Sequence, residues 1–311
     1  MPAVISHHFK FNPMKGKYDI LWKGMLEEVF EDLLRFVDPE IEKVLDLSRG
    51  VEFLDKELAA LYPEPEKKSN TRVVDKLVKV YMRDGGETWM LLHVEVQGKN
   101  ENGFAERMYR YYYRLLDRHE RDVAALAILT GRDGKKVPDK YERRTFWGRT
   151  LYEYKTLRIT DYTNEELAAS DNPFAIVVLV AKEALMKFKG SDDDADKKLL
   201  EQKLLIVKLL QEKEQFSERK IKAILIFLNN YVLFKKPETN RIFMRQVDQI
   251  TGQTNTMGIA EQLADIRVSE EKENVIKNLL TSAKLSLGEI AAVVGVSESF
   301  VEKVKEAVRV K

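Results

Sequence analysis

The segment Arg72–Gln97 reads RVVDKLVKVYMRDGGETWMLLHVEVQ, and it decides the fold class. Two runs rich in β-branched, aromatic and other apolar residues, 72–82 and 88–97, flank Arg83-Asp84-Gly85-Gly86, which is typical of a tight turn. The segment therefore predicts a β-hairpin. The pattern after it predicts a helix over 102–121, a strand over 123–129 and a further strand within 150–159. This order predicts an α/β fold with a mixed sheet flanked by helices.

The hairpin carries two acidic residues at informative positions. Glu95 is a charged residue in a run so apolar that an interior strand is expected. If Asp84–Gly86 forms a three-residue loop, Arg83 faces Glu87 and Asp75 lies directly opposite Glu95. Two bare carboxylates there would repel each other, so we expect either a bound divalent cation or one protonated group. A loop with an even number of residues would instead put the acids on opposite faces, unless a bulge restored the register.

The helix that follows has a basic stripe. At about 100° per residue, one narrow arc collects its arginines, and apolar residues occupy the adjacent arc. A row of guanidinium groups suits phosphate oxygens, because each offers forked donors at fixed charge. A solvated face paired with Glu106, Asp117 and Glu120 would also explain the stripe. The arginines are Arg107, Arg110, Arg114, Arg118 and Arg121.

Composition limits the chemistry. The 311 residues include 52 Lys and Arg, 51 Asp and Glu, four His and no cysteine. Thiolate metal sites, disulfides and thiol catalysis are therefore excluded, a cytoplasmic location is expected, and metal chemistry would rest on carboxylates with hard cations. The net charge of +1 conceals a basic segment, since Glu101–Arg158 holds 14 basic and nine acidic residues. The longest apolar run, Phe174–Ala181, is too short to span a membrane, so no membrane partner is expected.

With these residues the chain resembles the PD-(D/E)XK nuclease superfamily, and more narrowly the Rpn family of recombination-promoting nucleases and putative transposases. The likeness covers roughly residues 17–160. It is carried by the order and spacing of four short motifs: Tyr18-Asp19-Ile20-Leu21-Trp22-Lys23, Asp75, Glu95-Val96-Gln97, and Arg107-x-x-x-Tyr111.

The resemblance implies a restriction-endonuclease-like sheet of about four strands and a magnesium-dependent DNA endonuclease site. Asp75, Glu95 and the backbone carbonyl of Val96 would hold Mg²⁺ or Mn²⁺. Gln97 stands where lysine is usual and can only hydrogen-bond the water or phosphate. The remaining site residues are an upstream acid, Asp19 or Glu28, and the phosphate contacts Lys23, Arg107, Arg110 and Arg114.

Beyond Tyr162 the pattern is helical. The run Ser191–Asp196 is expected to be a solvated linker leading into a helix N-terminus. Leu287–Lys305 predicts a helix-turn-helix, with Gly295 at the turn and Ser297 as N-cap, although four glutamates balance four basic residues from Leu287 onward. Helices are expected over 19–44, 172–188, 197–212, 218–233 and 241–251, and the predicted domains are a nuclease-like domain (1–162), a helical region (163–268) and a C-terminal unit (269–311).

Three functions are compatible with these features. The leading hypothesis is a divalent-metal-dependent DNA endonuclease associated with recombination or transposon-like elements. The main alternative is a weak or inactive nuclease-fold protein that binds nucleic acid or regulates, which Gln97 favours. A third is a structural protein forming homo-oligomers through its helical C-terminal half. The sequence lacks GxGxxG, GxxxxGK[ST] and GxSxG, so dinucleotide, P-loop and serine-hydrolase functions have no support.

Overall fold

The computed structural model shows two compact units, Met1–Asn240 and Arg241–Lys311. The expected domain boundaries follow residues 162 and 268, whereas the division between the two units falls between Asn240 and Arg241. The described residues are 13–54, 74–95, 103–132, 137–186, 188, 190–252, 276, 279–280, 285–294, 296, 298, 301–302 and 305.

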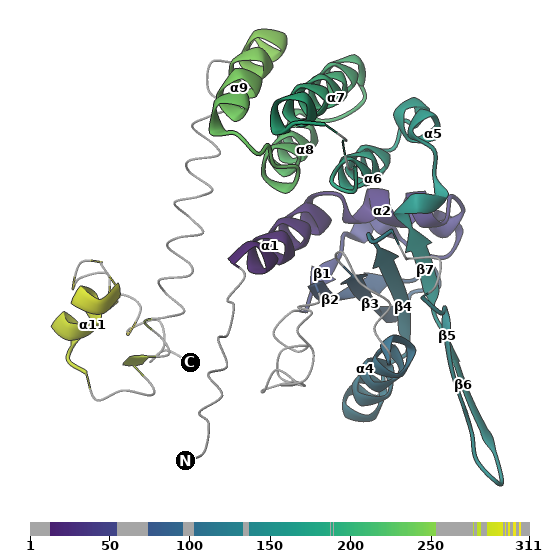
Figure 1. Ribbon diagram of the computed structural model, residues 1–311. Helices are drawn as coiled ribbons and strands as arrows, with labels where there is room; N and C mark the ends of the chain where they lie inside the picture. The colour runs from purple at the N-terminus through teal and green to yellow at the C-terminus, as the bar shows by residue number, and fades with distance from the viewer. Residues whose placement is uncertain are drawn as a thin grey trace, which may run out of the picture. The chain divides into compact units, whose positions relative to one another are not determined.

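The larger unit is a mixed sheet with helices on both of its faces (Figure 1). Its strands are β1 (Glu52–Phe53), β2 (Val74–Tyr81), β3 (Glu87–Glu95), β4 (Val123–Leu129) and β7 (Lys155–Arg158), with β5 (Lys140–Arg144) and β6 (Arg149–Glu153) forming a separate hairpin. The helices of this unit are α1 (Pro13–Glu28), α2 (Phe30–Val37), α4 (Phe104–His119), α5 (Asn164–Ala169), α6 (Pro173–Glu183), α7 (Asp192–Glu212) and α8 (Glu218–Tyr231), and α9 (Pro237–Thr251) begins in it.

The five-stranded sheet has the order β1-β2-β3-β4-β7. The first three strands are antiparallel neighbours, whereas β3, β4 and β7 run parallel. The predicted mixed α/β class is confirmed, and so are the predicted strands at 72–82, 88–97 and 123–129. The parallel pair β3–β4 needs a crossover connection, and α4 provides it.

Alternating residues of β2 face opposite sides of the sheet, and each side is covered by a different helix. Leu77 packs in one cluster with Trp89 and with Leu115 of α4. The neighbouring residue Lys76 is buried on the other side and pairs with Glu27 of α1. The sheet therefore separates α1 from α4, as Figure 1 also shows.

The predicted helix over 19–44 is two helices in the structure. Val29, at φ −126° and ψ 26°, interrupts the helical conformation between α1 and α2. The break lets both helices turn their apolar residues inward, and Trp22, Leu26 and Leu33 are fully buried. The periodicity alone gave no signal for a break, because Val29 is itself an apolar residue at helical spacing.

The other predicted helices are confirmed, with shifted ends. The apolar run in α6 forms a helix that is buried on all sides, because it lies between α2, α5 and α8. The expectation that Ser191–Asp196 is a solvated linker is wrong, because Asp192–Asp196 form the start of α7 itself and Asp196 is buried. Ser191 caps the helix and accepts a hydrogen bond from the backbone N–H of Asp194. No helix among the described residues is long and apolar enough to cross a membrane.

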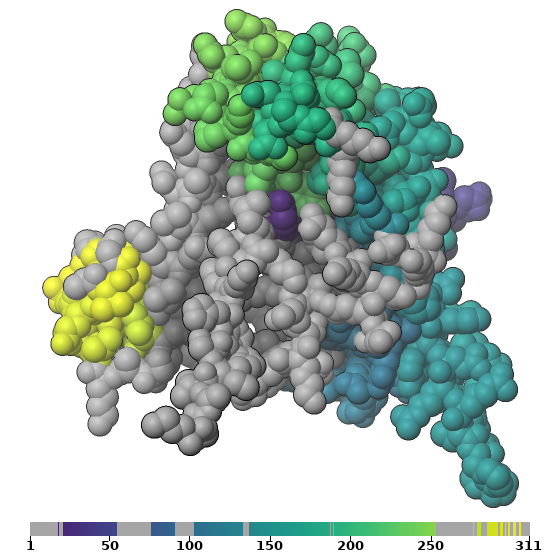
Figure 2. Space-filling model, viewed as in Figure 1, coloured from purple at the N-terminus to yellow at the C-terminus, as the bar shows by residue number. Residues whose placement is uncertain are grey.

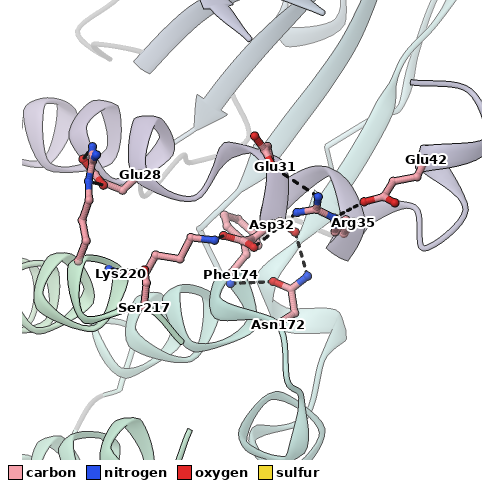
Figure 3. Close-up of polar contacts among 10 residues, drawn as sticks. Glu28, Glu31, Asp32, Arg35, Glu42, Asn172, Phe174, Ser217 and Lys220 are labelled. Atoms are coloured by element: carbon pink, nitrogen blue, oxygen red, sulfur yellow. Dashed lines mark hydrogen bonds and ion pairs between the residues drawn. The ribbon is translucent and has the colours of Figure 1, made fainter. Parts of the chain in front are cut away.

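A polar network joins the first helices to α6 and α8 (Figure 3). The Asn172 side chain donates to the carbonyl of Asp32 at 2.9 Å and accepts from the N–H of Phe174 at 2.8 Å, which caps α6. The carboxylate of Asp32 pairs with Lys220 of α8 at 2.6 Å. The two contacts of Asp32 link it to residues 140 and 188 positions later in the chain, so they tie α2 to α6 and α8.

The smaller unit contains α11 (Leu287–Val294). Ser286 and Glu289 form the reciprocal hydrogen bonds of a capping box at its start. Ile276, Ile290, Ala291 and Val301 form a buried apolar cluster. The partly buried Val294 and Val296 pack against this cluster. Gly295, Ser297, Phe300 and Val304 lie outside the described residues, so the helix-turn-helix stays a prediction.

Candidate metal and nucleic-acid site

The β2–β3 turn sets the positions of the two acidic residues. Met82 donates its N–H to the carbonyl of Gly86 at 2.9 Å, which makes Arg83–Gly85 the three-residue loop. Gly85 has φ +91°, and a three-residue hairpin loop normally needs glycine at this last position. The predicted loop, Asp84–Gly86, was one residue too late.

A contact from outside the hairpin explains this shift. The N–H of Arg83 donates to the carbonyl of Val44 at 2.9 Å, and Met82 forms a bridge with Leu45. Arg83 is thereby withdrawn from the ladder, and the turn begins at that residue.

The prediction that Asp75 lies directly opposite Glu95 is therefore wrong. The register pairs Asp75 with His93, and Glu95 is two residues farther along β3. Because the loop still has an odd number of residues, positions 75, 93 and 95 remain on one face of the ladder. Diagonal neighbours of this kind are separated by about 7–8 Å, which eases the repulsion expected for a direct pair. The side chains of Asp75 and Glu95, and all of Val96 and Gln97, lie outside the described residues.

The N-terminal half of α4 packs over the edge of the sheet where β3 ends. Phe104 and Met108 share a cluster with Ala127 and Leu129 of β4. In the parallel register, Leu129 is the partner of Glu95. The first turns of α4 are thus located at the same edge as positions 75 and 95. The N-terminus of a helix attracts anions, because its free N–H groups carry partial positive charge.

The arginines of α4 begin at this edge. Arg107 is half-buried, with its Cζ atom 5.4 Å from the centroid of the Phe104 ring. Arg110 pairs with Glu106 at 2.9 Å, one turn earlier, as expected for a solvated face. Arg114 is half-buried and Arg118 is exposed. Arg121, expected on the same helix, follows the end of α4 and pairs with Glu87 at 3.2 Å.

The candidate residues on α1 are on the other side of the sheet. Glu28 receives two hydrogen bonds of 2.6 Å from Arg219 of α8, so both its oxygens are engaged. Lys23 is half-buried on the same helix, and the side chain of Asp19 lies outside the described residues. The structure thus does not bring Glu28 together with the β2–β3 edge, because α1 packs on the face opposite to α4.

The structure groups no three His, Asp or Glu residues suitably for a metal ion among the side chains that it describes. Asp75 and Glu95 are not in that set. The donors predicted at the edge, two carboxylates and a carbonyl, are hard oxygen ligands of the kind that Mg²⁺ and Mn²⁺ prefer. The donor chemistry is therefore suitable for the expected cation.

A cluster of tyrosines lies next to α4 and was not expected from the sequence. Tyr109 stacks on Tyr141 at 4.8 Å, and Tyr112 stacks on Tyr152 at 4.6 Å. Burial raises the pKa of the Tyr152 hydroxyl above its ordinary value. The cluster joins the β5–β6 hairpin to the arginine-bearing helix. The signal in the sequence was the three-residue spacing of Tyr109 and Tyr112, which puts them on one face of α4, followed by Tyr141 and Tyr152 in the hairpin.

A separate cavity of about 390 Å³ lies among the helices on the α1 side. Glu183 and Asp196 line it together with Tyr18, Tyr231 and Lys235. Burial raises the pKa of Glu183, and its Oε2 atom has no hydrogen-bond partner. Lys203, close to Asp196, is completely buried, donates to the carbonyl of Val232 at 2.9 Å, and has its pKa lowered by burial to about 7.

Comparison of the chain with protein-family models, with curated proteins and with solved structures found no match.

Proposed function

We propose that this protein is a divalent-metal-dependent DNA endonuclease of the PD-(D/E)XK kind, related to the recombination-promoting Rpn nucleases. One observation supports the proposal above the others. The β2–β3 register puts positions 75 and 95 on one face of the ladder, at the edge covered by the first turns of α4. Two acidic residues, a helix N-terminus and Arg107 thus belong to one region. Together they suit a phosphodiester held beside a cation.

Each residue has a role in this proposal. Asp75, Glu95 and the carbonyl of Val96 hold Mg²⁺ or Mn²⁺. The bound cation supplies a Lewis acid that lowers the pKa of water and neutralises charge on the phosphate. Gln97 orients the attacking water through its amide. Arg107 fixes the scissile strand by forked hydrogen bonds to phosphate, and Arg110 and Arg114 contact the backbone farther along.

The proposed roles of Lys23 and of the upstream acids depend on α1, which lies on the other side of the sheet. Glu28 is committed to Arg219 and lies on the opposite face of the sheet, so we assign it to linking α1 with α8. Asp19 is retained as the upstream acid. A phosphate contact from Lys23 would require the DNA to reach the α1 side of the sheet.

The same proposal includes the finer features of the fold. It takes the sheet with its two helical layers as a restriction-endonuclease-like core and the apolar cluster around α11 as part of a helix-turn-helix. It also includes a cytoplasmic location, supported by the absence of cysteine, and self-association through the helical C-terminal half.

A second candidate function is a nuclease-fold protein that binds nucleic acid or regulates without efficient cleavage. Gln97 favours it, because an amide cannot supply the positive charge that lysine offers to the phosphate. It predicts DNA affinity that does not depend on a divalent cation.

Plasmid nicking distinguishes the two functions. The purified full chain is incubated with supercoiled plasmid and Mg²⁺ or Mn²⁺, alongside Asp75→Ala and the control Asp117→Ala, which removes an exposed carboxylate of α4. We expect nicking by the wild type and the control and at least a hundredfold loss in Asp75→Ala, with unchanged circular dichroism. Equal nicking by all three would refute the assignment of Asp75.

Thermal-shift titration with Mn²⁺ tests the site without requiring turnover. A ligand that binds only the folded state raises the melting temperature, so the wild type should be stabilised by Mn²⁺. Glu95→Gln removes one charged donor and should reduce that shift. An identical shift in both proteins would mean that Glu95 is not a ligand.

A further inference from the structure

The hairpin formed by β5 and β6 stands apart from the main sheet. It is a two-stranded sheet that projects from the larger unit, in teal at the lower right of Figures 1 and 2. Isolated two-stranded hairpins are marginally stable in water, so this one needs an anchor. The stacks of Tyr141 and Tyr152 on Tyr109 and Tyr112 of α4 provide it.

The tip of the hairpin carries two large aromatic side chains in solvent. Phe146 is 88% exposed and Trp147 is 92% exposed. Their rings contact each other at 4.6 Å in an edge-to-face arrangement. They occupy the two central positions between Thr145 and Gly148, where hairpin turns normally have Gly, Asn or Asp. The tip thus has aromatic residues where turns prefer small or polar ones, and it leaves their apolar surface in water. Such departures from stable local structure are typical of functional sites.

The strands beside the tip are basic. Arg144 and Arg149 are directly paired across the two strands, and like charges in that position are destabilising. Glu142 offsets part of the repulsion, at 2.7 Å from Arg144 and 3.1 Å from Arg149, and these arginines lower the pKa of its carboxyl. Lys140 and Arg143 add two more charges, so Lys140–Arg149 has a net charge of +3.

We propose that the β5–β6 hairpin is a DNA-binding ribbon that enters a groove of the duplex and inserts Phe146 and Trp147 against the base stack. This inference rests on the proposed function and deepens it. A two-stranded ribbon fits the major groove, and apolar side chains inserted at a base step are a known way of bending DNA. Arg144 and Arg149, on opposite strands, face the phosphates that border the groove.

The position of the hairpin favours DNA over other occupants. Its base is seated on the N-terminal half of α4, the segment that carries Arg107 and Arg110. The hairpin and the arginine-bearing half of α4 are therefore neighbours, and a polyanion bound across both would meet cationic side chains of each. An anionic lipid surface would also attract the arginines of the strands, so the tryptophan fluorescence experiment includes it as an alternative outcome.

Fluorescence anisotropy with a labelled 24-base-pair duplex tests the proposal. The full chain carries Asp75→Ala and is kept in EDTA, so that cleavage cannot interfere. We expect Phe146→Ser with Trp147→Ser to weaken binding at least tenfold, since stacking on a base contributes about 1–3 kcal/mol. The matched control Leu205→Ser removes an apolar side chain that is 63% exposed on α7 and should bind normally. The proposal would be overturned if the tip variant bound as tightly as the control, or if the chain carrying Asp75→Ala alone did not bind the duplex.

The arginine pair is tested separately. Arg144→Gln with Arg149→Gln should weaken binding and lower the slope of log affinity against log salt by about 2, one unit for each lost phosphate contact. The control Lys208→Gln changes one exposed charge on α7 and should leave the slope unchanged. An unchanged slope in the double variant would contradict the phosphate role.

Tryptophan fluorescence reports on the tip itself. Trp22 and Trp89 are buried, so Trp147 is the residue that acrylamide reaches readily. Duplex DNA should protect it and reduce quenching, and the change should disappear in Trp147→Phe. Protection of Trp147 by phosphatidylserine vesicles but not by DNA would overturn the proposal and identify a membrane as the partner of the tip. Protection that grows with protein concentration alone would overturn it and identify a second copy of the chain.

These outcomes separate the two proposals. Metal-dependent nicking that requires Asp75, with normal binding by the tip variant, would refute the hairpin proposal and leave the nuclease. Tip-dependent binding without any Asp75-dependent nicking would refute the nuclease proposal and leave the hairpin as a DNA-binding element.

Discussion

The buried amine of Lys203 leads to a quantitative prediction about stability. The side chain is completely buried in α7, and burial lowers its pKa from the ordinary value of 10.5 to about 7, against a smaller opposing effect of Asp196. Between these two values the unfolded chain keeps the proton and the folded chain does not. The unfolded state binds more protons there, so the free energy of unfolding rises with pH.

The magnitude follows from the shift. Integrating the difference in bound protons between pH 7 and pH 9 gives about 2 kcal/mol of added stability, with a folded pKa of about 7. Lys203→Met keeps the length of the side chain but removes the titrating group. It also leaves the carbonyl of Val232 without this donor, which lowers stability by a constant amount. The wild type should therefore gain about 2 kcal/mol of stability relative to the variant over this range.

Urea denaturation at pH 7, 8 and 9 measures the effect, followed by tryptophan fluorescence. All three tryptophans are in the larger unit, so the signal reports the unit that contains Lys203. The control Lys208→Met removes an exposed lysine from the same helix and should retain the wild-type pH dependence. The reasoning would be refuted if Lys203→Met and the wild type gained equal stability between pH 7 and pH 9.

Two further predictions concern the core. Burial raises the pKa of Glu183, so the folded state keeps a proton that the unfolded state loses, and stability falls as the pH rises from the ordinary value of 4.5 through the raised value. Glu183→Gln should therefore raise the melting temperature at pH 8, with a gain that shrinks as the pH falls toward 4.5. An equal gain at both pH values would contradict it. Met108 is fully buried between α4 and the sheet, so Met108→Ala should cost about 2–5 kcal/mol in urea denaturation, whereas the partly exposed Leu116→Ala on the same helix should cost much less. Equal losses in the two variants would show that α4 does not pack as described.

Much of the secondary structure could be predicted because it depends on local patterns. Alternation and turn residues identified β2 and β3, and helical periodicity identified α4. Ser191 and the acidic run marked the start of α7, since a capping side chain acts within one turn. The predicted site residues also came from the sequence, through a family resemblance and the unusual charge of Glu95.

The sequence missed elements whose stability comes from distant contacts. The strand expected within 150–159 is two strands in the structure, since most of β6 and all of β7 lie in that range. The strand β5 was missed, because it is mostly exposed and polar and has no alternating apolar face. The sequence signal of the β5–β6 hairpin was Phe146-Trp147 flanked by basic residues. Stacking on α4 is what holds the hairpin in place.

The sequence by itself determined the chemistry available to this protein: no thiols, a carboxylate pair near one hairpin, and arginines on the next helix. Only the tertiary structure decided how these groups are arranged. The hydrogen bond from Arg83 to Val44 moved the turn by one residue, which pairs Asp75 with His93 instead of Glu95. The sheet separates Glu28 from α4, and Arg219 engages both its oxygens. The physical reason is range, because periodicity and capping act over a few residues, whereas register and pairing depend on contacts between segments far apart in the chain.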